Sequence, residues 1–154
     1  MKITTSQQAS QILRTMRTAA EIPRGHLAKR LFISYKTLQK RELGQFTISV
    51  ETLHATAAEF GMEVHLLPRG TVTTGHLAVN SRRDLGQLIR DLRRRAGLSL
   101  GDLAAALGIT KSGLGNRETN ERAMSVTALT ETLDALGYDL IAVPRAAVAE
   151  RRAA

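Results

Sequence analysis

The chain has 154 residues and no cysteine, which excludes a disulfide framework, a thiolate nucleophile and a cysteine zinc site. Twenty-two lysines and arginines against 14 acidic residues give a formal net charge of +8, which favours a polyanionic partner such as nucleic acid. No apolar run approaches the roughly 18 to 20 residues of a membrane span, and the first residues have no signal-peptide core, so we expect a cytoplasmic protein without a membrane partner.

The first 70 residues are predicted to form four helices and a strand. Apolar residues at helical spacing indicate helices near residues 7–20, 24–31, 35–43 and 49–60. Pro23 is tolerable at the start of the second helix, because the first helical residue needs no amide donor. The run over residues 62–67 indicates a strand that Pro68 closes. Threonines and Gly75 then indicate a linker over residues 71–80.

Residues 81–145 have clearer signals for the same succession of elements. Ser81 can cap a helix with Asp84 in its capping box, and Gly97 can end that helix. The further expected elements are helices over residues 99–107, 110–119 and 125–136, and a strand over residues 138–143. Residues 146–154 remain as a tail.

The two segments are related by a constant offset of 76 residues, which holds without a gap from about Gln11 to Arg69. Matched pairs include Leu27 with Leu103, Ala28 with Ala104, Leu38 with Leu114, Arg41 with Arg117, Gly61 with Gly137 and Pro68 with Pro144. Such a period indicates one structural unit present twice. We therefore expect a first unit over residues 1–70 and a second over 81–145, and both carry excess positive charge.

Two short helices joined by a tight turn form a helix-turn-helix, whose second helix lies in the DNA major groove. Residues 98–118 resemble the Xre/Cro family of lambda-repressor-like domains, with Leu103-Ala104 in the second helix, Gly108-Ile109-Thr110 at the turn and Glu118 closing the third helix. The resemblance extends to the first copy. It implies a mainly α fold of two tandem lambda-repressor-like helix-turn-helix units, each with four or five helices followed by a short strand.

The resemblance also implies a structural clamp in each copy, between an arginine of the first helix and a glutamate that ends the third. The pairs are Arg17 with Glu42 and Arg93 with Glu118. If such a pair is partly buried, removing one partner costs on the order of 3 kcal/mol or more. The alternative is two exposed charges whose attraction contributes under about 1 kcal/mol.

Base-reading positions follow from the resemblance, residue by residue. They are Tyr35, Lys36 and Lys40 in the first copy and Lys111, Ser112 and Asn116 in the second. Lysine can donate to guanine O6 and N7, and asparagine can bond adenine bidentately, so Asn116 is the sharpest candidate for specificity. Phosphate contacts are expected where the second helix begins and after the third helix. Arg24 and Arg122 stand at those places.

Three residues depart from a regular unit. Phe32 replaces the turn glycine in the first copy, at the position of Gly108. In the second copy, Gly113 and Gly115 lie inside the expected recognition helix, where each costs nearly 1 kcal/mol relative to alanine. Either the backbone approaches DNA very closely there, or this copy no longer reads sequence and serves as a scaffold or binds a partner.

The strand that ends each copy resembles the strand extension of some Xre-like antitoxins and regulators. A single strand is not stable alone, so strands 62–67 and 138–143 are expected to find partners. They could pair with each other inside the chain or across a homodimer.

Catalysis, metal binding and cofactor binding have little support in the sequence. The histidines His26, His54, His65 and His76 have no metal-ligand spacing, and there is no phosphate-cradling glycine loop. We interpret the four histidines as surface or partly buried residues. The five aromatic residues are too few and too dispersed for a single-strand stacking platform.

These observations predict a sequence-specific regulator of transcription, acting as a repressor, that binds double-stranded DNA through helices 35–43 and 111–119 and is not an enzyme. The alternative belongs to another class. It is an antitoxin or anti-activator that binds a protein partner and contacts DNA weakly or not at all.

Overall fold

The structure of the chain, a computed structural model, describes residues 1–70, 77–78, 82–119 and 123–146, without the side chains of residues 77–78 and 82–84. Its elements in chain order are β1 (Lys2–Ile3), α1 (Ser6–Ala19), α2 (Arg24–Arg30), α3 (Tyr35–Glu42), α4 (Val50–Glu59), β2 (Met62–Pro68), β3 (Leu77–Ala78), α5 (Arg82–Arg95), α6 (Leu100–Ala106), α7 (Lys111–Thr119), α8 (Val126–Ala135) and β4 (Tyr138–Pro144). Residues 1–70 are called the first half below, and residues 77–146 the second half. Each half has a short strand, four helices and a longer strand in the same order.

Short polar side chains fix where the helices begin. Among the described residues, the side-chain oxygens of six accept a hydrogen bond from a backbone N–H in the first turn of the helix that follows; they are Thr5, Ser34, Ser49, Ser99, Thr110 and Ser125. Such caps satisfy amides that have no partner within the helix. The helices therefore lie close to the ranges expected from the sequence. Ser81, most of the expected linker and nearly all of the expected tail lie outside the described residues.

The long strands β2 and β4 pair with each other in an antiparallel ladder, with His65 opposite Ile141 at its centre. Each strand runs through its proline, one residue beyond the expected end. Of the two expected pairings, the structure therefore has the one within the chain. The homodimer through strands 62–67 and 138–143 stays a prediction.

Two further strands, which the sequence did not predict, extend this ladder into a four-stranded sheet of order β1-β4-β2-β3. Strand β1 of the first half pairs with β4, and β3, inside the expected linker, pairs with β2. The register places Lys2 opposite Ile141 and Ala78 opposite His65, which are equivalent pairs at the 76-residue offset. Each half thus adds its amino-terminal strand to the long strand of the other half.

A second contact between the halves obeys the same symmetry. Ser49 and Ser125 form an isolated antiparallel bridge. The N–H of Val50 donates to the carbonyl of Met124, and the N–H of Val126 donates to the carbonyl of Ile48, both at 2.9 Å. Because each bond has its counterpart 76 residues away, the halves are related by an approximate twofold axis through this bridge and the centre of the sheet.

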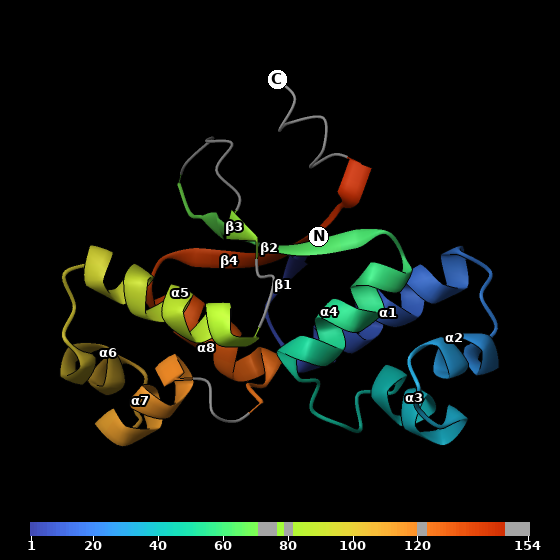
Figure 1. Ribbon diagram of the computed structural model, residues 1–154, viewed down its shortest axis with the longest axis horizontal. Helices are drawn as coiled ribbons and strands as arrows, with labels where there is room; N and C mark the ends of the chain where they lie inside the picture. The colour runs from blue at the N-terminus through green and yellow to red at the C-terminus, as the bar shows by residue number, and fades with distance from the viewer. Residues whose placement is uncertain (71–76, 79–81, 120–122, 147–154) are drawn as a thin grey trace.

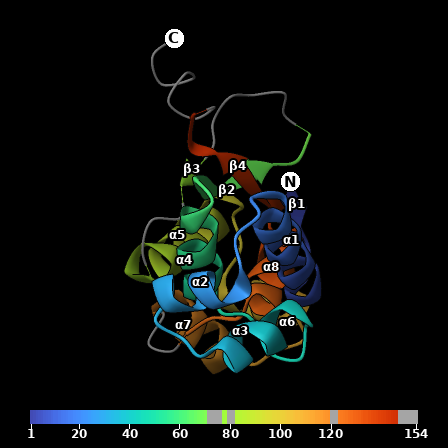
Figure 2. The same cartoon turned by 90° about the vertical axis from the view of Figure 1, so that its right-hand side faces the viewer.

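The main core lies between the sheet and helices α1, α4, α5 and α8. Its fully buried members include Leu53, Leu66, Ile89, Leu133 and Leu140. Two small clusters lie apart from it, one around Leu27 and Leu38 in α2 and α3, the other around Leu103 and Leu114 in α6 and α7. Figures 1 and 2 show that α3 and α7 lie at the end of the molecule opposite the sheet. In the part of the chain that the structure describes, no helix is long and apolar enough to cross a membrane.

Candidate nucleic-acid interface

The turns that join α2 to α3 and α6 to α7 have the same backbone conformation. Gly108 has φ +64° and Phe32 has φ +53°, so both are left-handed. In each turn the next amide bonds back to the helix, from Ile33 to the carbonyl of Ala28 and from Ile109 to that of Ala104, both at 3.0 Å. The turn therefore tolerates Phe32, although a left-handed conformation is strained for a residue with a Cβ. The Phe32 side chain is 95% exposed.

The expected clamp of the first half is present and buried. The Arg17 guanidinium donates to Glu42 Oε1 at 2.5 Å and Oε2 at 3.2 Å, and to the carbonyl of Ile22 at 3.0 Å. Glu42 is 4% exposed. Burial raises the pKa of this carboxyl, but hydrogen bonds and charges from Arg17 and Arg24 outweigh that effect and hold the pKa below its usual range. The pair joins α1, the loop before α2 and the end of α3.

The clamp of the second half repeats this geometry. The Arg93 guanidinium donates to Glu118 Oε1 at 2.5 Å, to Glu118 Oε2 at 3.0 Å and to the carbonyl of Leu98 at 2.9 Å. Both side chains are buried. The pKa of Glu118 is again lowered, because the bonds from Arg93 and Arg90 outweigh the effect of burial. The alternative of two exposed charges is wrong for both pairs.

The second cation of each clamp comes from a different helix in each half. In the first half, Arg24 of α2 donates from Nε to Glu42 Oε2 at 2.8 Å. In the second half Leu100 has the place of Arg24, and Arg90 of α5 bonds Glu118 Oε2 at 3.3 Å instead. Arg24 was expected to contact DNA phosphate, and the sequence did not single out Arg90. In the structure, the Nε of Arg24 is engaged within the protein.

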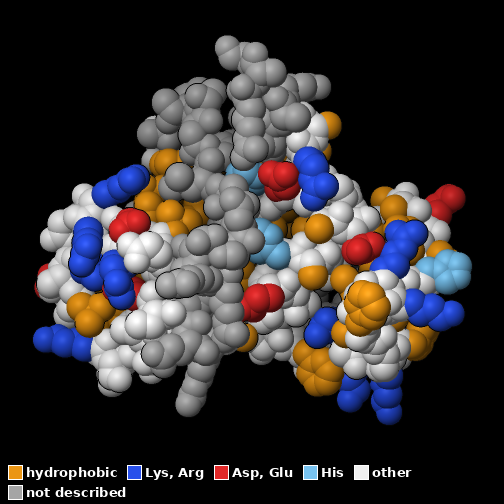
Figure 3. Space-filling view, viewed as in Figure 1, with side chains coloured by type: hydrophobic (Ala, Val, Ile, Leu, Met, Phe, Trp, Pro, Cys, Tyr) orange, Lys and Arg blue, Asp and Glu red, His pale blue; other side chains and the backbone are white. Residues whose placement is uncertain are grey.

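The expected base-reading side chains of the first half share one surface of α3. Tyr35 is 53% exposed, Lys36 is exposed and Lys40 is half-buried. The Lys40 ammonium lies 5.3 Å from the centre of the Phe46 ring, within the range of a cation–π contact. Figure 3 shows lysine and arginine side chains projecting from the lower edge of this half, beside hydrophobic side chains.

The corresponding surface of α7 is more polar and less bulky. Lys111, Ser112 and Asn116 are exposed. The Lys111 side chain lies over α6, because a Cβ added at Gly101 would come within 2.8 Å of Lys111 Cε. Phe32, Tyr35, Leu43 and Phe46 of the first half are matched at the 76-residue offset by Gly108, Lys111, Thr119 and Arg122. Arg122, the expected second phosphate contact, lies outside the described residues.

The two glycines of α7 differ in their surroundings. Gly113 donates its N–H to the Thr110 hydroxyl at 3.0 Å, and a Cβ at Gly113 would come within 3.2 Å of that same oxygen. A Cβ at Gly115 would meet nothing within 4 Å. A side chain at Gly113 would therefore need the cap hydroxyl to shift by a few tenths of an ångström, whereas packing gives no reason for a glycine at Gly115.

Another arginine that the sequence analysis did not single out, Arg117, connects α7 to α8. Arg117 donates to the carbonyl of Ala128 at 3.1 Å and to the Thr132 hydroxyl at 2.8 Å. The repeat matches Arg117 with Arg41, which marks the position as shared by both copies. It does not indicate which groups the arginine bonds.

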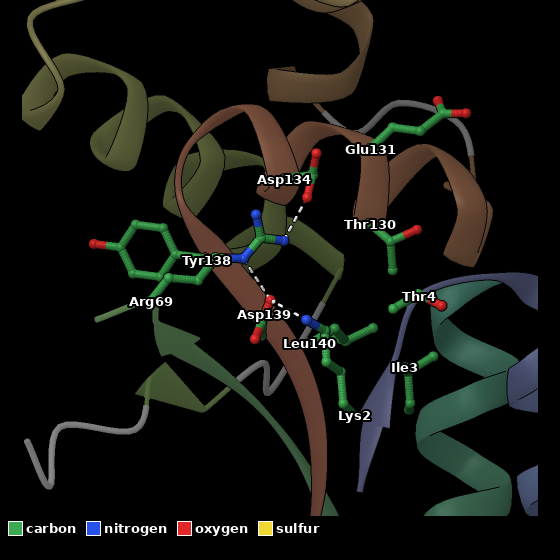
Figure 4. A pocket seen from close by; sticks show the side chains of 10 residues that line it. All are labelled: Lys2, Ile3, Thr4, Arg69, Thr130, Glu131, Asp134, Tyr138, Asp139 and Leu140. Carbon is green, nitrogen blue, oxygen red and sulfur yellow. Dashed lines mark hydrogen bonds and ion pairs between the residues drawn. The ribbon is translucent and has the colours of Figure 1, made fainter. Parts of the chain in front are cut away.

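A cavity of about 180 Å³ lies where β1 of the first half meets α8 and β4 of the second half. Figure 4 shows Arg69 reaching from the end of β2 to two aspartates of the second half. Its Nε donates to Asp139 at 2.6 Å, its Nη2 bonds Asp134, and Lys2 pairs with Asp139 at 3.1 Å. This ion network joins the halves on the sheet side, away from α3 and α7.

The three histidines among the described residues differ in their surroundings. His65 is 1% exposed and its Nε2 lies 3.0 Å from Glu63 Oε2, so the expectation of a surface or partly buried residue is wrong for it. His54 is half-buried, and burial followed by the charge of His65 lowers its pKa. His26 is exposed, and His76 lies outside the described residues. Among the residues that the structure describes, no group of three or more histidines or acids could hold a metal ion.

One comparison with known proteins gives a match. Residues 84–150 match a family model described as a helix-turn-helix domain. No curated protein and no solved structure matches the chain. The match includes α6 and α7 with the tight turn between them. The second half therefore contains a helix-turn-helix domain, and DNA binding is the function that this domain suggests.

Proposed function

We propose that the chain is a cytoplasmic, sequence-specific regulator of transcription of the Xre/Cro type, a repressor that binds double-stranded DNA through two tandem helix-turn-helix units. One observation carries the proposal. Two helix pairs with the same turn and the same buried clamp are related by an approximate twofold axis, and α3 and α7 both lie at the end opposite the sheet, on either side of the molecule in Figure 1. Twofold-related recognition helices suit the two half-sites of a DNA operator.

The approximate axis makes the operator an inverted repeat whose half-sites lie about one helical turn, roughly 34 Å, apart. The half-sites are unequal, because α3 presents Tyr35, Lys36 and Lys40 where α7 presents Lys111, Ser112 and Asn116. One chain carries both recognition helices. A single chain therefore covers a full operator and represses by occupying the promoter.

Different side chains contact the bases and the phosphates. Lys36 and Asn116 are exposed on the surfaces that face away from the core, where a lysine suits guanine and an asparagine suits adenine. Arg122 stands after α7, where a basic side chain contacts phosphate. The clamps keep α3 and α7 seated against their own halves and do not touch the DNA.

A second function is favoured by the apolar surface of the first half. Phe32, Leu43 and Phe46 are 95%, 52% and 44% exposed, and exposed apolar side chains that gather into one patch mark contact sites for other molecules. An antitoxin or anti-activator would bury this surface against a protein and bind DNA weakly or not at all.

Selection of duplexes from a random library, followed by fluorescence-anisotropy titration over a salt series, tests the regulator. We expect the selected duplex to bind at least about a thousandfold tighter than a scrambled one at physiological salt. Equal, weak and steeply salt-dependent binding to both would leave only nonspecific charge attraction and would contradict the proposal.

Two single-charge variants locate the DNA-binding surface. Lys36→Ala on α3 should weaken binding to the selected duplex and relax the base preference at one operator position. Arg145→Ala removes the same charge just after β4, on the sheet side, and should leave both quantities unchanged. Equal effects of the two variants would contradict the assigned surface.

A further inference from the structure

Arg24 links the buried clamp of the first half to a side chain on its recognition surface. Its Nε donates to Glu42 Oε2 at 2.8 Å, and its Nη1 donates to the Tyr35 hydroxyl at 3.1 Å. The guanidinium carbon also lies 5.6 Å from the centre of the Tyr35 ring. Two contacts from one planar group therefore hold both the hydroxyl and a face of this half-exposed ring.

The contacts of Arg24 differ from those of a phosphate anchor. Glu42, itself held by Arg17, fixes the guanidinium through its Nε. Bonds to Glu42 and then to Tyr35 raise the pKa of Arg24, because they stabilise its charged form. The side chain thus has a defined place in the protein before any DNA is bound, and that place is against Tyr35.

The second half provides a natural comparison in which this link is absent. At the 76-residue offset Leu100 replaces Arg24 and Lys111 replaces Tyr35. Glu118 takes its second cation from Arg90 on α5 at 3.3 Å. The fold therefore seats its third helix without an arginine at the start of the second. What the first half gains from Arg24 is the connection to Tyr35.

That connection changes what the Tyr35 hydroxyl can recognise. A phenol can donate one hydrogen bond and accept others. A cationic donor already occupies the Tyr35 oxygen, which disfavours a second donor there and leaves the O–H free to donate. In the major groove the acceptors are guanine N7 and O6, adenine N7 and thymine O4, whereas the amino group of cytosine is a donor.

We propose that Arg24 is a positioning residue which holds Tyr35 as a hydrogen-bond donor to an acceptor on a base edge in the half-site of α3. The inference rests on the proposed DNA-binding function and assigns that function's specificity to a pair of residues. Arg24 does not contact the base itself. It favours bases with an acceptor on the major-groove edge, because it keeps the Tyr35 hydroxyl oriented as a donor. The second half reads its half-site without such a pair.

The test uses the full chain and the duplex obtained by selection, with Arg24→Leu, Tyr35→Phe and the double variant. Leucine is the residue that the second half has at this position, and phenylalanine removes only the hydroxyl. Each single variant should weaken the selected duplex about tenfold, as expected for one good base contact. The double variant should also lose about tenfold, not a hundredfold, because both changes remove the same contact. Binding to a scrambled duplex and the salt slope should stay unchanged.

Lys29→Leu is the matched control, since Lys29 is an exposed cation of the same helix that has no contact with Tyr35 among the described interactions. It should leave the preference for the selected duplex unchanged. If Arg24→Leu does not fold, Arg24→Lys replaces it in the test. Lysine keeps a cation beside Glu42 but has no planar fork to reach both Glu42 and Tyr35. It should weaken binding to the selected duplex in the same way.

Three results would overturn the inference. If Arg24→Leu weakens selected and scrambled duplexes equally, lowers the salt slope by about one unit and adds to Tyr35→Phe, then Arg24 is a phosphate anchor. If Tyr35→Phe binds the selected duplex as tightly as the wild type does, the Tyr35 hydroxyl makes no contact that distinguishes bases. In both cases the regulator itself stands. If the wild type selects no sequence, the inference and the proposed function fail together.

Discussion

Replacing the clamp arginine by methionine should destabilise the second half more than the first. Arg93→Met removes the shorter bonds to Glu118 and leaves Arg90 at 3.3 Å, with a side chain that is 35% exposed. Arg17→Met leaves Glu42 with Arg24 at 2.8 Å, with a side chain that is 22% exposed. The glutamate of the second half therefore keeps the weaker partner.

The magnitude follows from burial and distance. Removing one partner of a buried ion pair costs about 3 to 5 kcal/mol, and Glu118 is 5% exposed. At an effective dielectric constant of about 20, the attraction across 3.3 Å is roughly 1 kcal/mol weaker than across 2.8 Å. We therefore expect Arg93→Met to lower the free energy of unfolding by about 3 to 5 kcal/mol, and Arg17→Met by about 1 kcal/mol less.

Urea unfolding at pH 7, followed by circular dichroism, measures both values, and Arg94→Met is the control. Arg94 is exposed on the same helix as Arg93, so its replacement should change stability by less than about 0.5 kcal/mol. If Arg93→Met costs under about 1 kcal/mol, the pair behaves like an exposed one and the reasoning is refuted.

The same pair makes stability depend on pH. The folded-state pKa of Glu118 is held below its ordinary value, so the stabilisation is fully present above the unfolded pKa of about 4.3. It is lost as the pH falls through the lower folded value. In Arg93→Met, burial without Arg93 should raise the pKa of Glu118, so the variant should lose less stability than the wild type on acidification. Parallel pH profiles would argue against this cause.

Four further substitutions test other parts of the structure. A left-handed residue with a Cβ costs about 1 kcal/mol. Phe32→Gly should therefore raise the melting temperature, and Gly108→Ala should lower it. If calorimetry shows a lower melting temperature for Phe32→Gly or a higher one for Gly108→Ala, the two turns are not strained in this way. Leu66→Ala, in a strand position that is 0% exposed, should cost about 2 to 5 kcal/mol in urea unfolding, and a cost under 1 kcal/mol would place the core elsewhere. Asn116→Ala should relax base preference at one operator position in a selection experiment without changing the salt slope, and an unchanged preference would remove Asn116 from the base-reading set.

Local signals in the sequence explain most of the helices. Ser34, Ser49, Ser99 and Ser125 cap helices at or within a residue of the expected starts. The clamp pairs could be predicted because a resemblance to a family fixes partners far apart in the chain. Among the expected site residues, those on α3 and α7 lie on the outer surface of these helices, but their contacts with DNA remain proposals.

Features that depend on tertiary contacts could not be predicted. Strands β1 and β3 have two residues each, too few for any alternation to show, and their hydrogen bonds go to the other half. The partner of Arg24 depends on where Tyr35 and Glu42 meet in space. The exchange from Arg24 to Arg90 as the second clamp cation likewise needs two helices brought together, and sequence spacing gives no sign of it.

The approximate symmetry survives large differences between the halves because backbone groups maintain it. The bridge at Ser49 and Ser125, the ladder of β2 with β4 and the two short edge strands all use N–H and carbonyl groups, which every residue except proline supplies in full. Side chains on α3 and α7 take no part in those contacts. They can therefore differ without disturbing the relation between the halves, so that one chain presents two unlike helices, α3 and α7, at a fixed spacing.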